Sequence, residues 1–158
     1  MTTAQENAWL DQEESYLAQV LRAHRWAVQY VAAGEEPDEP PFGYTIGMHG
    51  MVHPELVVVG LGSVESHALL QRVATMVVAG RDLVPGEQLS LPERDVTVEQ
   101  LPNPGEVVLG ANRLYRRPEV LSVEAFQLTW AHDGAYPWDP HYPCDPAACQ
   151  PRPGTWRA

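Results

Sequence analysis

The sequence predicts an α+β fold, in which a single domain has a largely antiparallel sheet packed against two or three helices. Two patterns predict this fold class. Apolar residues recur every three or four positions near residues 4–22 and 63–79, which is typical of amphipathic helices. In several shorter segments apolar residues occupy every second position, which is typical of strands. The domain is expected over residues 1–142, followed by a proline-rich C-terminal tail over residues 143–158.

Composition and charge narrow the classes of partner. A chain of 158 residues is long enough to bury a core without a disulfide or a metal. The formal charge of −11, from 21 acidic and 10 basic residues, opposes binding to nucleic acid or to an anionic membrane surface. The first residues lack the pattern of a secretory signal, and no apolar run is long enough to span a bilayer. We therefore expect a soluble, cytoplasmic protein.

The first predicted helix has one apolar stripe, which we expect to pack against the rest of the domain. Its members are Trp9, Tyr16, Leu17, Val20 and Leu21. Near residue 25 the apolar period changes from about 3.6 to 2, which predicts a strand over residues 25–32. The acidic, proline-rich segment 34–41 then predicts a surface loop.

The next two strands are predicted at residues 42–48 and 55–61. In the first, large side chains alternate with Gly43, Thr45 and Gly47, so one face is nearly bare. A bare face lets a helix or a ligand approach the backbone closely, and helix packing is the more common cause. The second strand, ELVVVGL, is apolar on both faces, which predicts a covered central position. Because neighbouring elements usually pair, the first three strands are expected to form a meander.

Downstream of this meander the pattern is weaker. After the helix at residues 63–79 we expect a strand, a helix weakened by its glycines, and a last strand. They cover residues 96–101, 107–115 and 121–130. The last strand is expected to bury Phe126, Leu128 and Trp130.

Four short blocks of sequence carry a resemblance to a known family. They are YTIG at 44–47, HPEL at 53–56, GL at 60–61, and FQLTW at 126–130 with the DG and YPW that follow it. In the order and spacing of these blocks, residues 25–140 resemble a bacterial family of small domains of unknown function. The resemblance implies no particular activity or cofactor. It places Tyr44, His53 and Glu55 within the family's blocks, and His49 between two of them.

The strongest candidate for a catalytic site is the loop HGMVHP with its flanking residues. His49, His53 and Glu55 would lie near Tyr44 if the two flanking strands pair. A histidine that titrates near neutral pH beside a carboxylate can act as a general acid or base. The alternative is structural: His53 would bond to a backbone carbonyl, and Glu55 would fix a turn.

Aromatic and acidic residues near the C-terminus form a second candidate region. We expect Trp130, Asp133 and Trp138 to shape a substrate pocket. With Asp133 and Asp139, the same region holds four potential zinc ligands, namely His141, Cys144 and Cys149 in an H-x2-C-x4-C spacing and His132. No paired C-x2-C motif accompanies them, so the sequence favours a structural tail, with free cysteines or a Cys144–Cys149 disulfide, over a metal site.

Two functions remain in competition at this point. The first is a small enzyme or enzyme accessory acting on a small molecule or peptide, with the His/Glu group at residues 44–55 as its site. The second is a noncatalytic module that binds a partner protein through its acidic surface and aromatic tail. No nucleotide-binding loop, nucleophile elbow or zinc-protease motif occurs, and the sequence does not identify whether a cofactor binds or which one.

Overall fold

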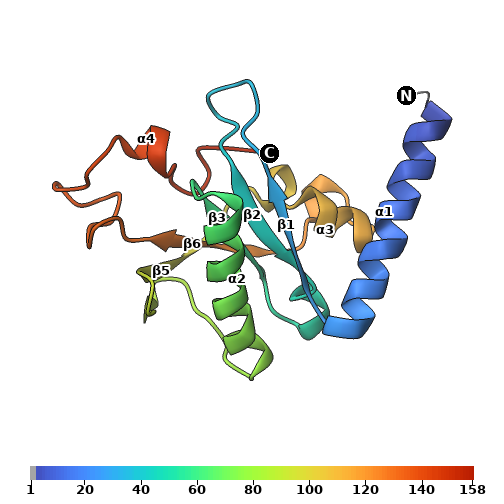
Figure 1. Ribbon diagram of the computed structural model, residues 1–158, viewed down its shortest axis with the longest axis horizontal. Coiled ribbons are helices and arrows are strands. Elements are labelled where there is room, and N and C mark those ends of the chain that lie inside the picture. The colour runs from blue at the N-terminus through green and yellow to red at the C-terminus, as the bar shows by residue number, and fades with distance from the viewer. Residues whose placement is uncertain (1–2) are drawn as a thin grey trace.

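The computed structural model describes residues 3–158 (Figure 1). Four α-helices lie within these residues: α1 (Thr3–His24), α2 (Ser63–Val78), α3 (Leu109–Leu114) and α4 (Pro146–Cys149). The strands there are β1 (Ala27–Val31), β2 (Phe42–Ile46), β3 (Glu55–Val59), β4 (Gln88–Ser90), β5 (Asp95–Gln100) and β6 (Ala125–Trp130). Short 3-10 helices span His49–Met51, Pro104–Glu106 and Glu119–Leu121. The fold is α+β, as the sequence predicts.

The six strands form one sheet in the order β1-β2-β3-β6-β5-β4. Every pair is antiparallel except β3 and β6, which run parallel with Glu55 opposite Ala125. The first three strands form the predicted meander, with Ala27 opposite Ile46 and Phe42 opposite Val59. The parallel pair is central, so β3 and β6 are buried along their whole length.

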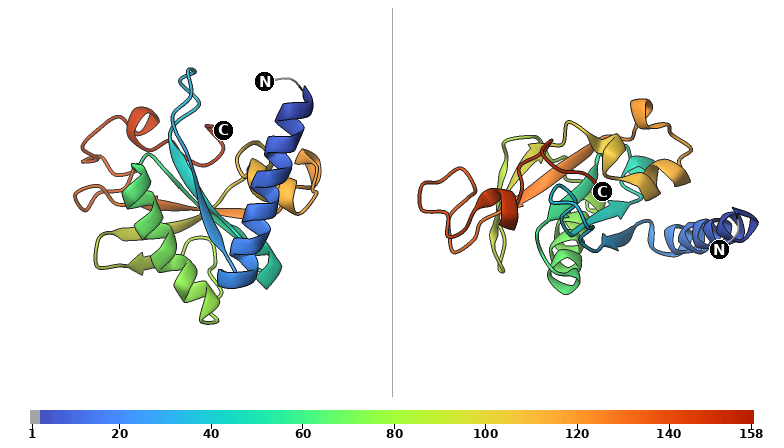
Figure 2. Two further views of the ribbon diagram at one scale, coloured as in Figure 1. Left: turned by 45° about the vertical axis from the view of Figure 1, so that its right-hand side comes forward. Right: turned by 90° about the horizontal axis from the view of Figure 1, so that it is seen from above.

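Helix α2 crosses the face of the sheet over β1, β2 and β3 (Figures 1 and 2). It approaches closely because β2 presents Gly43 to it. A Cβ atom on Gly43 would lie 3.2 Å from Leu70 Cδ1 and 3.3 Å from Ser66 Cβ, both on α2. Helix packing, the more common of the two expected causes, therefore explains the glycine at residue 43.

The opposite face of the sheet carries a second apolar cluster. Phe42, Tyr44 and Ile46 pack there with α3 and with Trp156 from the tail. Met48 would share this face if β2 ran on to residue 48, but its side chain joins the cluster under α2. The strand ends at Ile46, and Gly47 has φ +130°, so the chain turns before Met48 is reached.

Two downstream elements differ from expectation. The short strand β4 lies in a segment whose polar and proline residues hide its pattern. The strand predicted from residue 121 begins at Ala125, because Pro118 leads into a 3-10 helix that leaves Leu121 61% exposed. All six β6 side chains are buried, since the strand lies between β3 and β5 and is covered on both faces.

The stripe of helix α1 packs against the domain as predicted at one end only, where Leu17 and Leu21 contact the second apolar cluster. None of its described residues is buried, and Trp9 and Tyr16 are 51% and 66% exposed. The helix runs away from the sheet at an angle to β1, so the two elements diverge from their junction near residue 25 (Figure 1). No helix within residues 3–158 has the length and apolar character needed to cross a lipid bilayer.

The proline-rich tail is packed onto the sheet. Trp156 is 2% exposed, and its Nε1 donates a hydrogen bond to Gln127 Oε1. Gln150 is fully buried: its Oε1 accepts from Trp130 N, and its Nε2 donates to Trp130 O. The Gln150 amide thus satisfies a backbone N–H and C=O of β6 as a neighbouring strand would.

The close approach of α2 to β2 gives a test by substitution. We expect Gly43→Val to lower the free energy of unfolding by about 1–3 kcal/mol, because the added methyl groups would overpack the contact with Leu70 and Ser66. Ala33→Val is the control, since it adds methyl groups at an exposed position outside the helices and strands. Urea denaturation measures both. Equal stability of the two variants would contradict this packing.

Candidate functional site

The carboxylate of Glu55 is fully buried at the start of β3. Its Oε1 accepts hydrogen bonds from Thr45 Oγ1 at 2.9 Å and from Met48 N at 3.0 Å. Its Oε2 accepts from Gly47 N at 3.1 Å and from His49 N at 3.2 Å. Three of these donors are backbone N–H groups in the turn that leaves β2, so Glu55 holds the path of that turn.

Two opposing effects act on the pKa of Glu55. Burial raises this pKa to about 7, and the hydrogen bonds from His49, Gly47, Thr45 and Met48 oppose the rise. With four donors directed at its two oxygens, the carboxylate has little capacity left to accept a proton from a substrate. Its surroundings are those of a structural group.

His53 is 6% exposed, and both of its ring nitrogens are engaged. Nδ1 lies 2.8 Å from Pro54 O, and Nε2 lies 3.3 Å from Leu83 N. A carbonyl can only accept, and a backbone amide can only donate, so these contacts assign the proton to Nδ1. The ring packs edge-on against Phe126. His53 thereby joins the start of β3 to the segment between α2 and β4.

Tyr44 and His49 lie on other sides of this turn. Tyr44 is 1% exposed, and its hydroxyl accepts a hydrogen bond from Gly110 N at 2.8 Å. Burial raises the pKa of Tyr44 to about 12. The half-buried ring of His49 packs edge-on against Tyr115, with 4.7 Å between ring centroids. The structure therefore ties Glu55 to the turn that contains His49, but directs Tyr44 towards α3 and His53 towards Leu83.

The expected pocket residues of the second region lie near the opposite end of β6. Trp130 is five residues beyond Ala125, the partner of Glu55, which corresponds to about 16 Å along a strand. Its ring lies under the Arg94 guanidinium, and its Nε1 donates to Val59 O. Trp138 stacks on Tyr136 at 4.7 Å.

The remaining groups of this region form no constellation with the His/Glu group. Asp133 occupies an exposed turn with φ +50°. Cys144 and Cys149 are joined in a disulfide, and His132 Nδ1 lies 4.0 Å from Cys144 Sγ. Within residues 3–158, no three His, Cys, Asp or Glu side chains are arranged to hold a metal ion.

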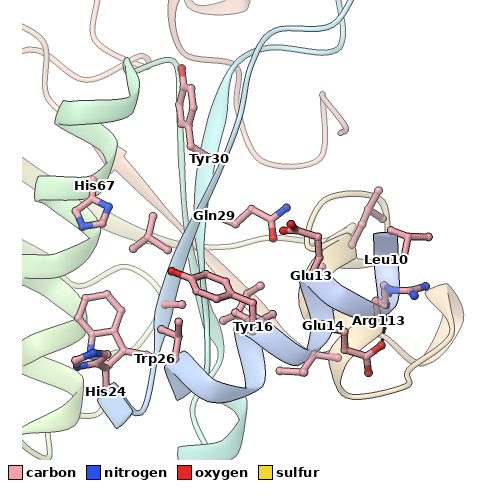
Figure 3. A pocket seen from close by; sticks show the side chains of 18 of the residues that line it. Leu10, Glu13, Glu14, Tyr16, His24, Trp26, Gln29, Tyr30, His67 and Arg113 are labelled. Atoms are coloured by element: carbon pink, nitrogen blue, oxygen red, sulfur yellow. Dashed lines mark ion pairs between the residues drawn. The ribbon is translucent and has the colours of Figure 1, made fainter. Parts of the chain in front are cut away.

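A large groove lies elsewhere, where α1 diverges from β1 (Figure 3). It has a volume of about 970 Å³ and includes none of the predicted site residues. Its wall on α1 consists of Trp9, Leu10, Glu13, Glu14, Tyr16, Leu17, Val20 and His24. Its floor is the continuous segment 26–30, which is Trp26 and the first four residues of β1, and α2 contributes His67 and Gln71. Parts of α3 close it, among them Arg113.

The charged groups of the groove differ in their partners. The Glu14 carboxylate lies 3.9 Å from the guanidinium groups of Arg113 and Arg116. The Glu13 carboxylate forms no ion pair with any residue from 3 to 158, and in Figure 3 it points towards Gln29 on β1. The Tyr16 ring extends from α1 across the groove towards the strand. An unpaired carboxylate and exposed aromatic rings are thus gathered in one concave surface.

Sequence reasoning missed this groove because it is a product of tertiary structure. The stripe on α1 was expected to be covered, and the uncharged segment 26–33 indicated a strand without indicating that it lies at an edge. A helix with exposed aromatic residues is followed within two residues by an uncharged strand. This combination is the sequence signal that could have indicated the groove.

The comparisons with known proteins agree with the sequence resemblance. A family model described as Domain of unknown function (DUF4262) matches residues 20–143. No curated protein and no solved structure matches the chain. The matched range includes β1 and α2, and most of α1 lies before it.

The role of His53 can be tested through stability. We expect His53→Ala to lower the free energy of unfolding by about 2–4 kcal/mol, because it leaves a cavity and unpairs Leu83 N–H and Pro54 C=O. The exposed His141, replaced by alanine, is the control. Thermal and urea denaturation provide the measurement. An unchanged unfolding midpoint for His53→Ala would return His53 to the candidates for proton transfer.

The pKa of Glu55 predicts a pH dependence. The unfolded carboxyl ionises near 4.5 and the folded one near 7, so in this window the folded state binds more protons. The contribution of Glu55 to the free energy of unfolding should therefore fall as the pH rises from 4.5 to 7. The slope can reach about 1.4 kcal/mol per pH unit.

Urea denaturation of the wild-type protein and of Glu55→Gln over this pH range isolates the effect, because other titrating groups cancel in the difference. The advantage of the wild type over the variant should shrink with rising pH. An advantage that grows with pH would mean that the four hydrogen bonds outweigh burial and that the pKa of Glu55 is not raised.

Proposed function

The chain belongs to the family described as Domain of unknown function (DUF4262), and we propose that it is a noncatalytic binding module that holds a polypeptide segment of a partner protein in the groove between α1, β1 and α2. The observation that carries this proposal is the groove itself. At about 970 Å³ it is at the upper end of the range for small-molecule sites, and it is open along a strand and a helix. Such an elongated surface suits a polypeptide better than a compact metabolite.

The side chains of the groove also support a protein ligand. Aromatic residues are the commonest anchors of protein interfaces, because they bury a large area at a small cost in conformational entropy. Trp9 and Tyr16 are more than half exposed on α1, and Trp26 and Tyr30 line the strand side. The free energy gained by covering these rings would favour an occupied groove.

The competing enzyme hypothesis depends on the His/Glu group at residues 44–55. Both nitrogens of His53 and both oxygens of Glu55 already have partners within the fold. Use of either group on a substrate would require breaking these contacts. The binding module therefore accounts for more of the geometry than an enzyme that uses this group.

A display selection tests the proposal. Peptides are selected from a random library against the full-length chain, and their affinities are then measured by titration calorimetry. Tyr16→Ala should weaken binding about tenfold or more, which is the usual effect of truncating an aromatic anchor. The variant should remain folded, because Tyr16 is 66% exposed.

Trp138→Ala is the matched control, since Trp138 is 44% exposed and lies outside the groove. We expect it to leave the affinity unchanged. Loss of binding on Trp138→Ala with Tyr16→Ala unaffected would place the interaction on the tail and contradict the groove. A selection that yields no peptide sensitive to Tyr16→Ala would also contradict it.

A further inference from the structure

Strand β1 is an edge of the sheet that has a free outer side. It pairs only with β2, in the register that places Gln29 opposite Tyr44. No described residue outside β2 forms a backbone hydrogen bond with Ala27–Val31. In an edge strand, alternate residues direct both N–H and C=O away from the sheet. The outer side of β1 therefore has donors and acceptors available for another strand.

The two edges of this sheet are built differently. The opposite edge, β4, has only three residues, and it is flanked by Pro85 and Pro92 and by the acidic Glu87 and Glu93. Short length, proline and charge are the usual means by which sheet edges are protected from pairing. From residue 26 to residue 33 the β1 segment contains no proline and no charged residue. One edge is protected and the other is suited to pairing.

The groove lies along this unprotected edge. Five consecutive residues, 26–30, line it, so it follows the strand instead of meeting it at one point. On the α2 side of β1, Trp26 and Val28 pack against the core cluster, and the Tyr30 hydroxyl donates to Leu61 O. Gln29 lies on the other side, near Gly110. An added strand would present alternate side chains to these two different surroundings.

The charges in and around the groove indicate that the added strand is basic. Glu13 faces Gln29 across the groove without an ion pair to any residue from 3 to 158, whereas Glu14 and Arg113 lie within 3.9 Å of each other. The chain as a whole has a formal charge of −11. A lysine or arginine in the ligand would meet Glu13 and would be attracted by the net charge. A second copy of the chain would instead bring a further formal charge of −11 and would be repelled.

We propose that the groove binds an extended, basic segment of a partner protein, which adds to the outer edge of β1 as a seventh strand of the sheet. Apolar side chains of the segment alternate with polar ones, and one of the polar side chains is a lysine or arginine that pairs with Glu13. This proposal rests on the proposed function and specifies its ligand. Backbone pairing with β1 supplies the common geometry, and Glu13 with the aromatic walls supplies the selectivity.

The first experiment tests strand addition with a synthetic probe. The probe is a blocked heptapeptide of alternating valine and polar residues, Val-Thr-Val-Lys-Val-Thr-Val, whose affinity is measured by titration calorimetry. Two N-methylated isomers block alternate N–H groups, one set on each edge of the extended peptide. One isomer should bind at least thirtyfold more weakly, and the other should bind within threefold of the parent.

Amide hydrogen exchange locates the pairing on the protein. On saturation with the parent probe, alternate amides within Ala27–Val31 should exchange at least tenfold more slowly, and β4 amides should not change. If both isomers bind alike and β1 amides are unaffected, strand addition is overturned, even though peptides sensitive to Tyr16→Ala would still support the groove. If the free chain is a dimer whose β1 amides are already protected from exchange, the occupant of the groove is a second copy of the chain, and the proposal of a partner segment is overturned.

The second experiment tests the basic residue. Glu13→Gln should weaken binding of the lysine probe about fivefold and should leave binding of a probe with glutamine in place of lysine unchanged. The control is Glu35→Gln, which changes the net charge equally but lies in the exposed loop after β1. Equal effects of the two variants would overturn pairing with Glu13. Tighter binding of a probe with glutamate in place of lysine would overturn the basic character of the ligand.

Discussion

The buried carboxylate of Glu55 is the interaction on which the functional surface depends. Through four hydrogen bonds it holds the turn that leaves β2, and Thr45 links the same carboxylate to Leu56 N at the start of β3. This turn also packs closely against the junction of α1 and β1, because a Cβ on Gly47 would lie 2.5 Å from Arg25 O. The buried carboxyl group of Glu55 thus links β2, β3 and the turn that lies against the junction of α1 and β1.

The tail explains why the groove lies at an edge of the sheet instead of at its centre. In open sheets, ligands commonly bind beyond the carboxyl ends of parallel strands. Here the corresponding place lies beyond β3 and β6, and the tail fills it. A Cβ on Gly60 would lie 2.1 Å from Cys149 O, and Gln150 bonds both backbone groups of Trp130. With this position closed by the chain itself, the free outer side of β1 is the accessible part of the sheet.

Much of the fold could be predicted from the sequence, because periodicity reports which faces are buried. The alternation of Phe42, Tyr44 and Ile46 with Gly43 and Thr45 identified β2 and favoured the close approach of a helix over that of a ligand. Short elements with polar residues, such as β4, could not be predicted. The parallel pairing of β3 with β6 leaves no pattern in the local sequence of either strand. The candidate site was harder to predict, since the same His-Pro-Glu spacing fits a catalytic pair and a structural one. What separates the two is a set of backbone donors and acceptors, such as Leu83 N and Pro54 O, whose positions depend on the whole fold.

The divergence of α1 from β1 resolves a conflict that an unprotected edge creates. An uncharged strand with free backbone groups invites pairing with any extended chain, including other copies of itself. Helix α1 restricts this, because it diverges from the strand at their junction near Arg25 and its side chains form a wall of the groove along residues 26–30 (Figure 1). The acidic surface adds repulsion between copies, and Glu13 places one negative charge beside the pairing edge. Helix α1 limits the space beside β1, and the charge of Glu13 favours a basic segment. Together they allow the outer side of β1 to stay unpaired without binding every extended chain.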